Sequence, residues 1–370
     1  MERFDVIVIG GGAMGTAAAR ATAERGRSTL LLERFTLGHG LGSSGGPTRI
    51  FRYNYADPAY VAMVKLAAEH WRELEDAAAV ELLRTTGGLD VGVAAAACAA
   101  TVEAAGIPIR RIDPREVHER WPAVRFPGGA ELYLQEHGGV LRAVETVRAQ
   151  AQLARRAGAD VRQETCVTSL RTSGDAVEVG TDAETFSGGV AVVAAGAWAP
   201  GILRDVDIGL PATPSLEQVA YFELDEPSPL PTVIERWDDG VHADYTVPDP
   251  WEPGTFKVGL HQGGDVVEPD PDRRPDEPDP HRLTRSRAHA AQRFGPHRAT
   301  GAVDSCLYTN TADEDFVLDR TGPVVVASPC SGHGFKFVPL IGEILADLAT
   351  DESPPIPLER FRLDRPTLRA

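Results

Sequence analysis

The chain contains very little lysine. Of its 37 basic residues, only Lys65, Lys257 and Lys336 are lysines, and all the others are arginines. Basic residues are also outnumbered by 54 acidic ones, which gives a formal net charge of −17. Nucleic acids and anionic membranes carry negative charge themselves, so this surplus argues against both as partners. We therefore expect neither partner, and the positions of the three lysines become informative.

Cysteine is scarce as well, and long apolar runs are absent. The four cysteines, at 98, 166, 306 and 330, lack the spacing of metal ligands and are too few for a disulfide framework in 370 residues. We therefore expect no metal site, and a reducing compartment is the default. No apolar stretch is long enough to span a membrane, and the N-terminus lacks the pattern of a secretory signal. These absences predict a cytoplasmic protein.

The first residues have the pattern of a βαβ unit. An apolar run at 4–9 predicts a strand, the Ala-rich segment 16–25 a helix, and 29–32 a second strand. The turn between them fits G-x-G-x-x-G, with Gly10 for the tight turn, Gly12 for close approach to a pyrophosphate, and Gly15 for close packing of helix on strand. Ala13 and Met14, within this turn, are expected to contact the cofactor ahead of the helix, whose N-terminus favours phosphate. This context predicts a dinucleotide site.

The second strand ends in an acid that extends this site. Glu33 stands where a carboxylate can accept hydrogen bonds from a ribose diol. Arg34 follows it and leaves a 2′-phosphate open as a second interpretation. The motif by itself does not distinguish FAD from NAD.

The rest of the chain alternates between helical and strand-like segments. Asp-Pro pairs at 57–58 and 113–114 predict two helix starts, and 141–157 and 339–350 read as further helices. Strands are expected at 161–170, 176–179 and 190–195, and the alternation over 219–260 favours an antiparallel sheet with one covered face. The Pro- and Asp-rich stretch 265–281 is expected to be an exposed acidic loop.

Four segments, in this order, resemble the FAD-dependent amine oxidases of the D-amino acid oxidase superfamily, and among them the monomeric sarcosine oxidases. The segments are Gly42–Arg52 (GSSGGPTRIFR), Lys257–His261 (KVGLH), Cys306–Thr309 (CLYT) and Ser331–Lys336 (SGHGFK). The resemblance implies a monomer of mixed α/β (α+β) class with two domains. A Rossmann-like FAD-binding domain would comprise 1–83, 142–211 and 305–370, and an antiparallel-sheet substrate domain 84–141 and 212–304.

The resemblance also implies roles for individual residues. Arg52 and Lys336 match a pair that holds the substrate carboxylate, and Lys257 matches a lysine beside the flavin that promotes its reaction with oxygen. Two of the three lysines therefore fall on family positions. His261, Tyr308 and Tyr245 are expected to line the pocket, Tyr245 by an approximate match only.

Further residues are expected to bind the flavin. Cys306 matches a cysteine bonded to the 8α carbon of the flavin in relatives, which implies covalent FAD, and the loop before Lys336 would lie under the flavin pyrimidine and favour negative charge there. The other expected contacts are Ser43, Thr48, Arg49, Val167, Ala195, Gly196, Trp198, Gly332, Gly334 and Phe335.

The implied activity is oxidation of the C–N bond of a secondary, N-methyl or cyclic amino acid to an imine, with O2 reduced to H2O2. Three alternatives stay open: an oxidase that tailors a cyclic imine or amine in secondary metabolism, an FAD dehydrogenase with another electron acceptor, and a flavin-binding subunit without turnover. The family pattern has two histidines where this chain has Ser44 and Gly45. This departure argues against sarcosine itself as the substrate.

Overall fold

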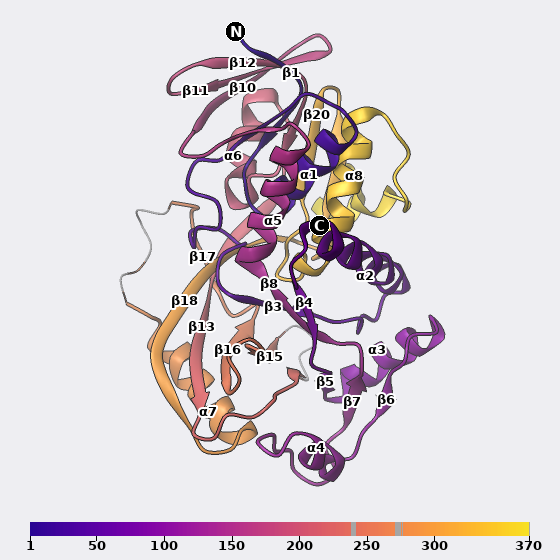
Figure 1. Ribbon diagram of the computed structural model, residues 1–370, viewed down its shortest axis with the longest axis vertical. Coiled ribbons are helices and arrows are strands. Elements are labelled where there is room, and N and C mark those ends of the chain that lie inside the picture. The colour runs from indigo at the N-terminus through magenta and orange to yellow at the C-terminus, as the bar shows by residue number, and fades with distance from the viewer. Residues whose placement is uncertain (238–241, 271–274, 276, 370) are drawn as a thin grey trace.

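The computed structural model describes residues 1–237, 242–270, 275 and 277–369 (Figure 1). In this part of the chain the strands form one sheet of eight strands, one of nine and a small one of three. The first large sheet lies at one end of the molecule with both chain-terminal regions, and the second lies at the other end (Figure 1). The mixed α/β class agrees with the prediction from the sequence, and the second sheet is antiparallel except for one parallel pair of strands.

Five parallel strands form the centre of the first sheet. Their spatial order is β20 (Val324–Ser328), β12 (Thr185–Val193), β1 (Arg3–Ile9), β2 (Thr29–Leu32) and β9 (Asp160–Arg162). Antiparallel strands β10 (Val167–Ser173), β11 (Ala176–Thr181) and β19 (Val317–Thr321) extend it. Strands β1, β2 and β20 are nearly continuous apolar runs, which is typical of parallel strands that are covered on both faces.

Helices cover this sheet. They are α1 (Ala13–Glu24), α5 (Ala143–Arg156), α8 (Val338–Thr350) and, at the far side, the short α6 (Ala199–Leu203), while α2 (Pro58–Ala78) packs on α8 and α5. Helix α1 packs closely on α8, because Gly342 has no side chain and a Cβ there would lie 2.7 Å from the Cβ of Ala17. Asp57 caps α2 through the amide of Ala59, as the Asp-Pro pair predicts.

In the second sheet, neighbouring residues of a strand face opposite sides. Its strands are β5 (Gly88–Val91), β6 (Arg110–Arg111), β7 (Leu132–Gln135), β13 (Ala212–Leu224), β14 (Thr232–Arg236), β15 (Ala243–Pro248), β16 (Thr255–His261), β17 (Asp265–Val266) and β18 (His297–Thr311). The paired Phe222 and Phe256 point into a core beneath α7 (Pro280–Arg293), while their neighbours Tyr221 and Lys257, also paired, face a cavity on the opposite side. Successive residues of these strands therefore face the core and the cavity in turn.

Several boundaries differ from the prediction. Helix α1 starts at Ala13, three residues early, and Leu141 belongs to β8 (Gly139–Arg142) instead of the next helix. The expected strand 161–170 is two strands, β9 and β10, separated by a turn at Glu164 with φ of 53°. The sheet of β3 (Thr48–Phe51), β8 and β4 (Leu83–Thr85) and the helices α3 (Val93–Ala104) and α4 (Pro114–Arg120) complete the fold. The proposed domain boundaries stay a prediction, and β18 runs across the one at residue 305.

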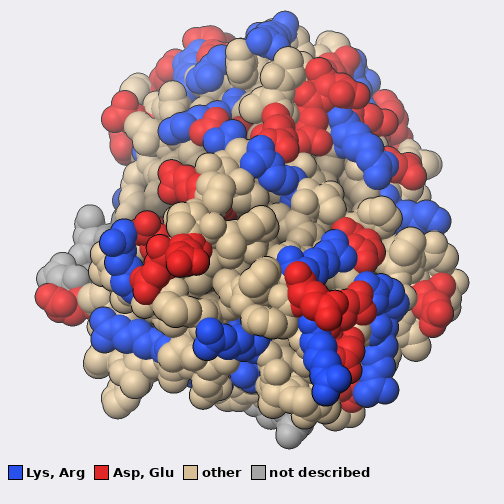
Figure 2. All heavy atoms as spheres, turned by 60° about the horizontal axis from the view of Figure 1, so that its bottom comes forward, with Lys and Arg blue, Asp and Glu red and all other residues tan. Residues whose placement is uncertain are grey.

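The surface shows no strong segregation of charge on the face drawn in Figure 2, where acidic and basic side chains are interspersed. Of the expected acidic loop, residues 271–274 and 276 lie outside the described residues, and the described part includes the short strand β17. In the described part of the chain, no helix combines the length and the apolar composition needed to cross a membrane.

Candidate active site

A cavity of about 650 Å³ collects the residues that the sequence singled out. It is lined by loops at the ends of β1, β2, β12 and β20 and by the inner face of the second sheet. Every predicted cofactor or catalytic residue lines it except Gly15. Gly15 instead fits α1 against the turn, because a Cβ there would lie 1.8 Å from the carbonyl oxygen of Gly10.

The nucleotide end of the cavity is built on the glycine turn. Gly10 has φ of 103°, which favours glycine, and Gly12 is the N-cap of α1 without a side-chain cap of its own. The amide of Ala13 donates to Ser44 Oγ at 3.0 Å, and a Cβ on Gly12 would lie 3.1 Å from that oxygen. Ser44 therefore caps the first turn of α1 at Ala13, and Gly12, Ala13 and Met14 line the cavity beside it.

Glu33 is held at the end of β2 by the same turn. Its carboxylate accepts from the amides of Gly11 at 2.6 Å and Phe35 at 2.7 Å, and His39 Nε2 lies 3.4 Å away. Burial raises the pKa of this carboxyl, but the hydrogen bonds from His39, Phe35 and Gly11 outweigh it and leave the pKa below its usual value. Glu33 is thus an ionised acceptor at the cavity wall.

The described cavity residues fit FAD. The N-terminus of α1, where Gly12, Ala13 and Met14 line the cavity, suits a pyrophosphate, and Glu33 suits a ribose. In the described structure Trp198 Nε1 and Ser328 Oγ are buried without a hydrogen-bond partner, and both residues line the cavity. Buried polar atoms are normally paired, so these two call for a polar ligand.

The loop 42–49 and Lys257 form the middle of the cavity. Arg49 donates to the carbonyls of Ser43 at 2.9 Å and Gly45 at 2.6 Å, which fixes the loop. Lys257 Nζ donates to the carbonyl of Thr48 at 2.7 Å. Burial, together with the charge of Arg49, lowers the pKa of Lys257 to about 7. A buried lysine with so low a pKa is a typical functional group.

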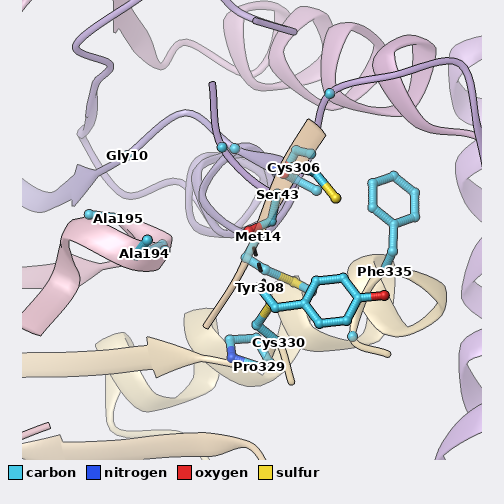
Figure 3. Close-up of a pocket in the computed structure, with 18 of the residues that line it drawn as sticks. Gly10, Met14, Ser43, Ala194, Ala195, Cys306, Tyr308, Pro329, Cys330 and Phe335 are labelled. Carbon is cyan, nitrogen blue, oxygen red and sulfur yellow. Dashed lines mark hydrogen bonds between the residues drawn. The ribbon is translucent and has the colours of Figure 1, made fainter. Parts of the chain in front are cut away.

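Two cysteines face this part of the cavity (Figure 3). Cys306, on β18, and Cys330, after β20, lie around the same space as Ser43 and Tyr308. Burial raises the pKa of Cys306, while Arg49 and Lys257 oppose this effect. Cys330 Sγ accepts from the amide of Thr309 at 3.3 Å. On balance the pKa of Cys306 is raised, so its thiol is protonated at neutral pH, and both thiols line the cavity.

A cationic region forms the far end. Lys336, in a 3-10 turn ahead of α8, donates from Nζ to the hydroxyl of Tyr55 at 2.8 Å, and the guanidinium of Arg52 lies 4.3 Å over the same ring. Burial, then the charge of Arg52, lowers the pKa of Lys336 well below its usual value. Among the described residues neither cation has a carboxylate partner, so the pair can receive an anion.

Uncharged side chains close the remaining walls. Gly332, with φ of 74°, lies so close to Tyr308 that a Cβ would be 2.2 Å from the ring. Tyr245 lies opposite Gly259 on the neighbouring strand and covers it. Burial, then Arg52, lowers the pKa of His261 to about 3, so this imidazole is neutral at ordinary pH.

Comparison with known proteins identifies the whole arrangement. The family described as FAD dependent oxidoreductase matches residues 5–348. The chain belongs to this family. Its dinucleotide is accordingly FAD, and the NAD interpretation is wrong. The fold is that of FAD-binding oxidases, as solved structures confirm.

Relatives of this FAD dependent oxidoreductase cover nearly its whole length. Monomeric sarcosine oxidase of Bacillus sp. (strain B-0618) is 32% identical, over 99% of this chain and 97% of the relative. N-methyl-L-tryptophan oxidase of Salmonella agona (strain SL483) is 28% identical, over 98% of this chain and 99% of the relative. The structure of NikD, an unusual amino acid oxidase essential for nikkomycin biosynthesis, has a TM-score of 0.88 at 26% identity and covers 98% of both chains.

Several residues in and beside the cavity of this FAD dependent oxidoreductase could not be recognised from the sequence. Tyr55 carries no motif, although it precedes a helix start and follows Arg52 by three residues. Arg236 lines the cavity from β14 and had no signal among so many arginines. Ser44 turns toward the N-terminus of α1, and a Cβ on Gly45 would lie 2.7 Å from the carbonyl of His39. The two departures from the family pattern thus border the nucleotide turn as well as the cavity.

Proposed function

We propose that this protein oxidises the C–N bond of a secondary, N-methyl or cyclic amino acid. The CH–NH unit of the substrate loses two electrons and two protons to become an imine, and O2 takes up both to become H2O2. One observation carries the proposal: Arg52 and Lys336, from distant parts of the chain, converge on one half-buried tyrosine without a carboxylate partner in the described structure. An amino-acid carboxylate is a natural ligand for them.

Arg52 and Lys336 would hold this carboxylate in complementary ways. A guanidinium offers a planar pair of donors that matches a carboxylate, and an ammonium adds a compact charge. Tyr55 supports both, because it accepts from Lys336 and stacks under Arg52. With the carboxylate fixed, the C–N bond of the substrate has one orientation in the cavity.

FAD, when bound, supplies the two-electron acceptor for this oxidation. The turn at Gly10–Gly15, Glu33 and the loop at 42–49 would hold it, and Cys306 would bond to it covalently. Lys257, when protonated, provides a cation that favours transfer of electrons to oxygen. His261 stays neutral and adds no positive charge near the substrate nitrogen, which must itself be unprotonated. Activity should therefore rise with pH. We further propose that the protein acts as a monomer.

Anaerobic bleaching of the purified yellow protein tests the proposal. The panel should contain N-methyl, cyclic and primary amino acids, followed by measurement of oxygen consumption and peroxide. We expect bleaching by a bulkier N-methyl or cyclic amino acid and weak turnover of sarcosine, because Ser44 and Gly45 replace two histidines of the family pattern. Brisk sarcosine turnover would contradict the latter expectation, and a protein that no amine bleaches would contradict the proposed function.

A second candidate is an oxidase that tailors a cyclic imine or amine. The similarity to NikD over 98% of the chain favours it. An FAD dehydrogenase is the remaining alternative, and Lys257 argues against it. Bleaching by substrate with no return of colour in air would favour the dehydrogenase.

A further inference from the structure

Arg236 lines the far end of the cavity together with Arg52 and Lys336, and no family segment of the sequence contains it. It lies on β14, where alternate residues face opposite ways: Ile234 and Arg236 line the cavity, whereas Glu235 pairs with Arg293 of α7 at 2.5 Å. Opposite Arg236 on β15 stands Ala243, which also lines the cavity. The small side chain of Ala243 leaves space in the cavity for the guanidinium of Arg236.

Arg236 and Arg52 converge on one backbone oxygen. Both guanidinia donate to the carbonyl of Asn54, the bond from Arg236 Nη2 being 3.5 Å long. Lys336 approaches the same region, since its partner Tyr55 also underlies Arg52. Like charges repel strongly in a buried site, and the charge of Arg52 accordingly lowers the pKa of Lys336, so this arrangement favours a bound anion. In the described part of the chain, Arg236 has one acidic partner, Asp90, and Arg52 and Lys336 have none.

The ion pair with Asp90 does not satisfy the hydrogen-bonding capacity of the Arg236 guanidinium. Arg236 Nη2 is 3.8 Å from Asp90 Oδ1, which is too far for a hydrogen bond. The other carboxylate oxygen of Asp90 accepts a hydrogen bond from the side-chain amide of Gln135. Arg236 Nε is buried without a hydrogen-bond partner in the described structure. Because Arg236 lines the cavity and its acidic partner in the described structure lies beyond hydrogen-bond distance, its guanidinium suits a planar anion.

The charge balance indicates how many anions the cavity takes. At the far end of the cavity, Arg52, Lys336 and Arg236 face one described carboxylate, that of Asp90, so with Lys336 protonated one α-carboxylate of a substrate still leaves an excess of positive charge there. The pKa of His261 reflects this excess of positive charge, because after burial the charges of Arg52, Arg236 and Lys336 all lower it. A single carboxylate is therefore not the best complement of this cavity.

We propose that the substrate carries a second acidic group, which Arg236 binds while Arg52 and Lys336 hold the α-carboxylate. The substrate class is then an N-alkyl or cyclic amino acid with an acidic side chain, of the kind represented by N-methylglutamate. This inference rests on the proposed function and specifies the substrate of the same site.

Two matched substrates test the inference with the flavin-loaded protein. Racemic N-methylglutamate and N-methylglutamine differ only in the charge of the side chain. We expect kcat/KM to be at least about tenfold higher for the acid, as hydrogen bonds between charged groups imply. Arg236→Gln should reduce this ratio to near one, and Arg236→Lys, which keeps the charge but not the fork, should retain part of it. Arg298→Gln, at an exposed ion pair with Glu223, is the matched control.

A binding measurement separates this inference from the proposed function. Glutarate should raise the melting temperature of the wild-type protein more than butyrate does, and Arg236→Gln should remove the difference. A ratio near one in the wild type, or an equal loss for both substrates in Arg236→Gln, would overturn the second acidic subsite. If neither amino acid is oxidised, the oxidase function fails for this class, and glutarate against butyrate still decides whether the diacid site exists.

Discussion

The ammonium of Lys336 donates a hydrogen bond to the hydroxyl of Tyr55, with 2.8 Å between the two atoms. Lys336 lies in the turn before the last long helix, and Tyr55 just ahead of α2, so the contact joins two ends of the chain. Tyr55 Oη also lies 3.1 Å from His333 Nδ1. The tyrosine thus positions the lysine that we propose to hold the substrate carboxylate.

Removal of this hydroxyl should weaken substrate binding. In Tyr55→Phe the ammonium loses one of its acceptors and keeps the carbonyl of His333, so Nζ is less well positioned. We expect KM to rise about tenfold with a smaller change in kcat, since a hydrogen bond to a charged group contributes about 1.5–3 kcal/mol. Steady-state kinetics give the split between KM and kcat. Tyr133→Phe, whose hydroxyl contacts Glu131, is the control, and equal effects of both variants would contradict the role of Tyr55.

Lys257 should make stability depend on pH. Its pKa is about 7 in the folded protein and 10.5 in an unfolded chain. Below pH 7 the ammonium is charged in both states and its burial destabilises the fold fully. Between pH 7 and 10.5 the unfolded chain binds the extra proton, so this penalty decreases as pH rises. Lys257→Met should therefore stabilise the protein by a few kcal/mol at pH 6, on the order expected from the shift, and by much less at pH 9.

Urea unfolding of wild type and Lys257→Met at both pH values measures this difference. Lys65→Met, at an exposed position of α2, should change stability little at either pH. If Lys257→Met raises the free energy of unfolding equally at pH 6 and pH 9, burial of a charged Lys257 does not destabilise the fold.

Cys306 should retain the flavin through acid precipitation. We expect the yellow colour to stay with the precipitated protein in wild type and to move to the supernatant in Cys306→Ser. Cys330→Ser is a matched control, because Cys330 lines the same cavity but already accepts a hydrogen bond from Thr309. Colour in the wild-type supernatant would refute the covalent bond, and colour lost only in Cys330→Ser would move the bond to the other thiol.

Glu33 should support the fold in its ionised form. The lowered pKa means that its contribution is complete above about pH 4.5 and is lost as pH falls through the folded value. Glu33→Gln keeps one acceptor oxygen and turns an NH2 donor toward the other of the two backbone amides, those of Gly11 and Phe35, which should destabilise the protein by about 1–3 kcal/mol at pH 7. The difference in unfolding free energy between wild type and variant should shrink toward pH 3.5. A difference that does not change with pH would contradict an ionised Glu33.

Much of the site was predictable because its chemistry depends on short contiguous segments. Gly10, Gly12 and Gly15 are restricted by local backbone geometry, and a strand before them and a helix after them are visible as apolar periodicity. The rarity of lysine made Lys257 and Lys336 conspicuous. Boundaries were less predictable: the early start of α1 and the break between β9 and β10 depend on packing that the local pattern does not contain.

Residues that act through distant partners were invisible in the sequence. Arg236 is one arginine among many until the pairing of β14 with β15 turns it into the cavity. Tyr55 gains its meaning only from Lys336, which lies 281 positions away. Ser44 likewise becomes a cap for α1 only when the loop folds back.

The sequence by itself determined the dinucleotide turn, the mixed α/β class and the resemblance to FAD-dependent amine oxidases, because glycine geometry, hydrophobic periodicity and short motifs are local properties. The tertiary structure decided which charged side chains share one poorly hydrated cavity. That outcome depends on strand register and on which face each strand buries, and a shift of one residue would turn Arg236 or Lys257 to the opposite side. The pKa shifts and the excess of positive charge follow from that arrangement alone.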